Sequence, residues 1–79
     1  MTKVELDNWW CGLTRNQKER IASKAASKQK GEDIVVNYPA CTQWWNELPL
    51  DKKEWLHEHC TDKHGYLLKE WTEGRSYSY

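Results

Sequence analysis

Hydrophobic side chains recur at helical spacing near the amino terminus. They occupy positions i, i+3, i+4 and i+7 of one helix face, formed by Leu6, Trp9, Trp10 and Leu13. Thr2 and Glu5 have the spacing of a capping box, in which each side chain accepts the other residue's backbone N–H. Gly12 is placed to end the helix, because glycine tolerates the left-handed conformation of a helix stop. The pattern predicts a first helix between Thr2 and Gly12.

Three further helices are predicted from similar signals. The expected ranges are about 15–29, 39–47 and 51–63. The first of these is rich in alanine and is followed by Gly31, a second glycine stop. Pro39 suits a first helical position, where its missing N–H costs nothing. Pro49 separates the last two helices, and Gly65 is expected to stop the final one.

Two short segments fit a helix less well. Ile34–Val36 is β-branched and lies between a glycine and a proline, which favours an extended segment or a short strand. Tyr66–Trp71 is either a fifth short helix or a strand that pairs with Ile34–Val36, because periodicity over six residues does not separate the two. Residues 74–79 have the composition of a mobile tail.

The chain also contains an internal similarity with a period of 35 residues. Trp9-Trp10-x-x-Leu13 recurs as Trp44-Trp45-x-x-Leu48. The register continues through the pairs Asn16/Asp51, Lys18/Lys53, Glu19/Glu54 and Ile21/Leu56. Asn16 with Glu19, and Asp51 with Glu54, have the spacing of a helix-start cap. The similarity indicates two diverged copies, at about 2–31 and 37–65.

The predicted fold is therefore mostly α, with four short helices in two helix-turn-helix copies. We expect a single domain over residues 1–73, with a two-stranded element from Ile34–Val36 and Tyr66–Trp71 as the structural alternative. The expected core contains Trp9 or Trp10, Leu13, Ile21, Trp44 or Trp45, Leu48, Trp55 and Leu56. On the fourth helix His59 and Cys60 are expected to share the buried face with Trp55 and Leu56.

Composition narrows the class of protein. Seventy-nine residues allow one small domain, and six Trp and four Tyr can supply much of its core. No stretch approaches the roughly 20 apolar residues that cross a bilayer, and the first residues lack the apolar centre of a signal peptide. Three cysteines, an odd and small number, favour free thiols over a disulfide framework. We expect a cytoplasmic protein.

Charge is balanced over the whole chain but unevenly placed. Residues 14–30 hold six cations against one anion, a net charge of +5, and residues 31–62 hold seven anions against two cations, a net charge of −5. A stripe of basic side chains at i, i+4 and i+8 lines one side of the second helix, formed by Arg20, Lys24 and Lys28. Arg15, at the start of the same helix, joins them as a candidate nucleic-acid contact. Such a stripe could bind nucleic-acid phosphates, or it is simply the solvated side of an amphipathic helix. A pI of about 6.8 favours the second interpretation, because nucleic-acid domains usually have a basic excess.

One side of the fourth helix holds a set of potential metal ligands. His57, Cys60 and His64 are spaced i, i+3 and i+7, and Cys11 or Cys41 could complete a zinc site. A close ligand doublet such as Cys-x-x-Cys is absent from the sequence, so no metal or other cofactor is expected. The sequence also lacks a glycine-rich phosphate loop and a nucleophile elbow, so we expect neither an enzyme nor a small-molecule substrate.

The two tryptophan pairs remain the main candidates for a binding surface. Neighbouring residues on a helix point about 100° apart, so one ring of each pair should lie in the core and the other at its rim. Exposed rim rings would anchor a protein partner or a second copy of the chain, through Trp9, Trp10, Trp44 and Trp45. Alternatively the rim rings pack between the two copies. The sequence thus favours a non-enzymatic interaction module, with nucleic-acid binding as the alternative and a zinc-stabilised module as the third.

Overall fold

The computed structural model describes residues 1–72, and this part of the chain is mostly helical. Its helices are α1 (Lys3–Cys11), α2 (Arg15–Lys30), α3 (Ala40–Glu47), α4 (Leu50–Cys60) and α5 (Lys69–Thr72). The four predicted helices are present, and α5 occupies the end of the segment whose structure the sequence left open. The predicted tail, 74–79, and the predicted domain end at residue 73 lie outside the described residues.

Side-chain caps explain where α1 and α2 begin. Thr2 and Glu5 form the predicted capping box, and Thr14 and Gln17 form a second one that the sequence analysis missed. The cap predicted at Asn16 is therefore wrong, because Thr14 starts α2 two residues earlier. Each box satisfies two backbone N–H groups that the first turn of a helix leaves without a partner.

The two glycine stops differ. Gly31 has φ +71°, the left-handed conformation predicted for a helix end. Gly12 has φ −78° and is right-handed, so the prediction there is wrong in detail although α1 ends beside it. Its N–H still donates to carbonyls of the last turn, at Asn8 and Trp9, so the last turn of α1 is closed without a left-handed residue.

Prolines precede both helices of the second half. Pro39 is the residue before α3 rather than its first residue, and Pro49 precedes α4, so the cap expected at Asp51 is not the start of that helix. α4 ends at Cys60, three residues before the predicted end. The reason is local competition for the backbone: the Asp62 carboxylate accepts the N–H of His64 and of Tyr66, which closes a turn in place of the helix.

The proposed two-stranded element does not form between residues 34–36 and 66–71. Ile34–Val36 is extended but bonds to side chains of α2: the Ile34 N–H donates to Ser27 Oγ at 2.8 Å, and the Val36 N–H donates to Ser23 Oγ at 2.8 Å. Two serines one helical turn apart thus replace a partner strand. The other candidate strand, residues 66–71, forms only an isolated antiparallel bridge from Leu67 to Thr61, and α5 begins two residues later.

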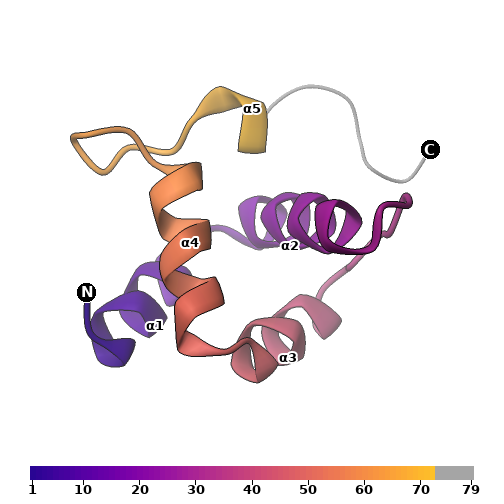
Figure 1. The fold of residues 1–79 in the computed structure, drawn as a ribbon, viewed down its shortest axis with the longest axis horizontal. Helices are drawn as coiled ribbons and strands as arrows, with labels where there is room; N and C mark the ends of the chain where they lie inside the picture. Colours follow the sequence, from indigo (N-terminus) through magenta and orange to yellow (C-terminus); the bar gives the residue numbers. More distant parts are fainter. Residues whose placement is uncertain (73–79) are drawn as a thin grey trace.

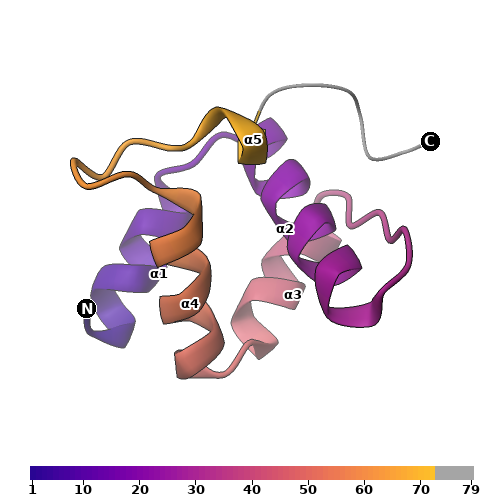
Figure 2. The same cartoon turned by 45° about the horizontal axis from the view of Figure 1, so that its top comes forward.

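The helices pack in pairs that join the two halves of the chain. α1 lies against α4, and α3 lies against α2 (Figure 1). α5 returns across the top of α2 after the loop from α4 (Figure 2). Each of these contacts therefore joins a helix of the first half of the chain to a helix of the second half.

The core lies between these pairs. Its buried members are Leu6, Trp10, Ile21, Ala22, Ala25, Cys41, Trp45, Leu56, Cys60 and Trp71. Leu13 and Leu48, both predicted in the core, are half-buried and pack against its edge. Two predictions for α4 are wrong: the Trp55 side chain is 40% exposed, and His59 is exposed. Trp71 takes the place expected of Trp55, because α5 brings its ring down onto α2.

Candidate functional site

The tryptophan pairs form a cluster at the centre of the molecule. Trp10 and Trp45 are 2% and 1% exposed and stack with ring centroids 4.7 Å apart. Trp9 and Trp44 are half-buried and lie against the ring of the opposite pair, at 5.9 Å from Trp45 and 6.0 Å from Trp10. One ring of each pair is thus in the core and its neighbour at the rim, as predicted. Of the four rings in the predicted binding surface, Trp10 and Trp45 are buried, and Trp9 and Trp44 are partly exposed.

A polar contact closes one side of this cluster. The Lys53 side chain is 2% exposed, and its ammonium lies 3.0 Å from Asp7 Oδ1 and 4.9 Å from the centre of the Trp45 ring. Trp45 Nε1 donates to the same carboxylate oxygen at 2.9 Å. Lys3, Lys53 and Trp45 all donate to Asp7, and these bonds hold the pKa of its carboxyl well below the usual range. The contact is structural: it ties α1 to the start of α4.

The basic stripe of α2 is largely occupied by contacts within the chain. The Arg15 guanidinium lies 5.0 Å from the centre of the Tyr38 ring. Lys24 donates to the Glu70 carbonyl at 2.6 Å, and its ammonium lies 4.9 Å from the centre of the Trp71 ring. Arg20 is half-buried, and Lys28 is exposed. The four predicted side chains do not form one free cationic surface.

The potential zinc ligands are not brought together. His57 packs edge-on against Trp9 at 4.9 Å, and burial lowers its pKa. Cys60 is fully buried, which raises the pKa of its thiol to about 12, whereas His64 is exposed beyond the end of α4. Within residues 1–72, no three side chains of His, Cys, Asp or Glu are arranged to hold a metal ion.

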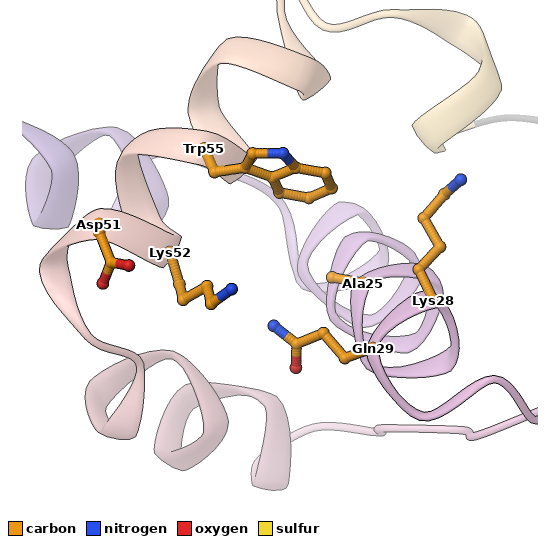
Figure 3. A pocket seen from close by; sticks show the side chains of 6 residues that line it. All are labelled: Ala25, Lys28, Gln29, Asp51, Lys52 and Trp55. Carbon is orange, nitrogen blue, oxygen red and sulfur yellow. The ribbon is translucent and has the colours of Figure 1, made fainter.

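A cleft of about 370 Å³ lies between α2 and α4. It is lined by Ala25, Lys28, Gln29, Asp51, Lys52 and Trp55. Figure 3 shows the Trp55 indole reaching from α4 toward α2, with the Lys52 and Gln29 side chains pointing toward each other below it. The volume is in the range of ligand-binding clefts, and its walls combine an aromatic ring with cationic and amide donors.

A smaller hollow of about 130 Å³ extends the cleft toward α5. It shares Lys28 and Trp55 with the cleft and adds Lys24, His59, Glu70 and Trp71. His59 stacks on the Trp55 ring at 4.1 Å, and its Nδ1–H donates to the Trp55 carbonyl at 2.8 Å. Trp71 meets the same ring edge-on at 6.4 Å. These contacts fix the orientation of the exposed indole, so the cleft is formed before any ligand arrives.

The helical pattern places Trp55 in the core and therefore does not predict this cleft. A signal was present in the 35-residue register, which aligns Trp55 with Arg20, a residue assigned to the polar side of the second helix. A tryptophan at a position that holds arginine in the other half indicates an aromatic side chain on the surface.

Comparisons with known proteins give no match to this chain. No family model, curated protein or solved structure matches it. Within residues 1–72, no helix combines the length and the apolar character needed to cross a membrane.

Proposed function

We propose that this chain is a small, non-enzymatic interaction module that binds a protein partner through the cleft around Trp55. The observation that carries the proposal is the 40% exposure of a tryptophan whose ring is held in place by His59 and Trp71. Tryptophan is enriched at the energetic centres of protein interfaces, because a rigid ring covers a large area at little cost in conformational entropy. The proposal moves the binding surface from the tryptophan pairs to α2 and α4.

The two buried thiols are not activated nucleophiles, which supports a non-enzymatic role. Burial raises the pKa of the Cys60 thiol to about 12 and also raises that of Cys41, so both thiols are protonated at neutral pH. Neither residue lines the cleft. The three free cysteines support the further proposal of a cytoplasmic location, where thiols stay reduced.

A comparison of two exposed aromatic residues tests the proposed surface. Peptides selected from a random library on the wild-type protein are titrated against Trp55→Ala and Tyr66→Ala. Tyr66 is a matched control, because it is exposed and lies outside the cleft. We expect Trp55→Ala to weaken binding at least tenfold, on the order of 1.4 kcal/mol, and Tyr66→Ala to leave it unchanged. Equal binding by all three proteins would overturn the proposal.

Nucleic-acid binding by α2 is the second candidate, with less support. Lys28 is exposed and has no ion pair within residues 1–72, but Arg15 and Lys24 already contact Tyr38 and Trp71. A titration with mixed-sequence nucleic acid at about 50 and 200 mM salt separates the candidates, since phosphate-driven binding weakens steeply with salt.

We also propose that the chain is a diverged internal repeat of two helix-turn-helix units. Residues 35 positions apart share their degree of burial in four pairs: Leu6/Cys41, Trp10/Trp45, Ile21/Leu56 and Ala25/Cys60. The packing of α1 on α4 corresponds, under exchange of the two units, to the packing of α3 on α2.

A further inference from the structure

The cleft carries unneutralised positive charge. Three of its six lining residues end in N–H donors, Lys28, Lys52 and Gln29, against the single carboxylate of Asp51. Within residues 1–72 neither Lys28 nor Lys52 forms a salt bridge, whereas Lys3 and Lys53 both pair with Asp7. Two lysines that line one cleft and form no salt bridge in the described part of the chain favour an anionic ligand.

The same cleft offers an apolar surface. Ala25 and the Trp55 ring form its walls, and the smaller hollow continues this surface to Trp71. An apolar side chain placed there would be removed from water on two sides, at a gain of roughly 25 cal/mol per Å² of buried apolar area. The cleft therefore combines one apolar contact with two cationic groups at its mouth.

A protein segment fits this arrangement better than a nucleic acid does. His59 covers one face of the Trp55 ring, so a ligand can reach only the rest of the ring. Asp51 lies in the cleft and Glu70 in the adjoining hollow, where they would repel a continuous phosphate backbone. Carboxylates at separate positions of a peptide can reach Lys28 and Lys52 without meeting these two residues.

We propose that the Trp55 cleft binds a protein segment in which one apolar side chain is flanked by carboxylates. The apolar side chain packs between Trp55 and Ala25, and the carboxylates pair with Lys28 and Lys52. This inference rests on the proposed function and adds the chemistry of the partner to it. Electrostatic pairing at the mouth sets the specificity, and contact with the ring supplies most of the affinity.

The test is a selection of random nine-residue peptides on two proteins, the wild type and Lys28→Glu/Lys52→Glu. We expect the wild type to enrich peptides with Asp or Glu on both sides of an apolar residue. The double variant should bind those peptides at least tenfold more weakly and enrich peptides with Lys or Arg in the flanking positions. The matched control is Lys30→Glu/Lys63→Glu, which changes the net charge equally at exposed lysines outside the cleft. Circular dichroism of each variant checks that it is folded.

The outcomes distinguish the inference from the function on which it rests. Peptides that depend on Trp55 but carry no acidic residues, or equal loss in both double variants, would overturn the acidic-segment inference and leave the proposed function in place. Peptides that bind regardless of Trp55 would overturn both. Salt-sensitive binding of mixed-sequence oligonucleotides that is lost in Lys28→Glu/Lys52→Glu would assign the cleft to nucleic acid and overturn both as well.

Discussion

Trp10 and Trp45, 35 positions apart in sequence, stack in the core with their ring planes 1° from parallel. The contacts on either side of this stack are nearly equivalent: Trp9 meets Trp45 at 5.9 Å and 57°, and Trp44 meets Trp10 at 6.0 Å and 47°. Their hydrogen bonds are not equivalent. Trp45 Nε1 donates to Asp7, whereas the buried Trp10 Nε1 finds no acceptor within residues 1–72.

This difference predicts unequal costs for the same substitution at the two positions. Trp45→Phe removes an indole N–H that donates to a carboxylate, while Trp10→Phe removes one that has no partner. Both lose similar ring area, so we expect Trp45→Phe to be more destabilising by about 1 kcal/mol. Urea unfolding followed by circular dichroism measures the difference. Equal midpoints, or a greater loss for Trp10→Phe, would contradict the assigned hydrogen bonding.

The proposed repeat predicts how the missing hydrogen bond can be supplied. Thr42 is 35 positions after Asp7, and Lys18 is 35 positions before Lys53, so Thr42→Asp would place a carboxylate where the second unit lacks one. We expect a gain in the free energy of unfolding of about 1 kcal/mol. An acid in the first turn of α3 can itself stabilise that helix by about 0.5 kcal/mol, so Trp10→Phe/Thr42→Asp is the control. A gain that survives in full without the Trp10 N–H would argue against the repeat.

Acid should weaken the contact between Asp7 of α1 and Lys53 of α4. The folded state depresses the pKa of Asp7, through hydrogen bonds from Lys3, Lys53 and Trp45. Its contribution is therefore present above the ordinary carboxyl pKa of about 4 and is lost as the pH falls toward the folded value. Urea midpoints at pH 7, 4.5, 3 and 2 should fall less steeply for Asp7→Asn than for the wild type. Asp33→Asn, at an exposed carboxyl outside this contact, should follow the wild-type profile.

The three thiols should differ in their reactivity. Cys11 is exposed, whereas Cys41 and Cys60 are buried, and burial raises the pKa of both buried thiols. Because the thiolate is the reactive form, a thiol reagent at pH 8 should modify one cysteine per chain rapidly and the other two only as the protein opens. Cys11→Ser should remove the rapid phase. Three equal rates in the native protein would be incompatible with the core described above.

The sequence predicted the helices well because their signals are local. Capping residues, glycine stops and the spacing of apolar side chains located α1 to α4 within a few residues. The sequence did not reveal the hydrogen-bond partners of Ile34–Val36. That segment bonds to the side chains of Ser23 and Ser27, and these contacts depend on how the loop folds back onto α2. Branched residues indicated an extended segment but not its partner.

The candidate site was less accessible to sequence analysis. Trp55 and Trp71 are both tryptophans near a helical apolar face, and composition alone gives no reason to bury one and expose the other. Tertiary packing decides: α5 seats Trp71 on α2 and leaves Trp55 at the edge of the cleft. Lys53 shows the converse: a lysine is rarely buried, and its contacts with Asp7 and the Trp45 ring, both made by tertiary packing, explain its position.

The exchange of packing partners between the two halves has a consequence for how the molecule comes apart. α1 packs against α4, and α2 packs against α3 and α5. In residues 1–72, each of these main contacts therefore joins a helix that precedes the connection at residues 31–39 to a helix that follows it. A peptide that ends in this connection would contain helices without the helices against which they pack. By itself, such a peptide should be unfolded. Mixed with the complementary peptide, it should regain helicity, as fragments of one cooperative unit do. Cleavage there therefore yields two dependent pieces rather than two domains.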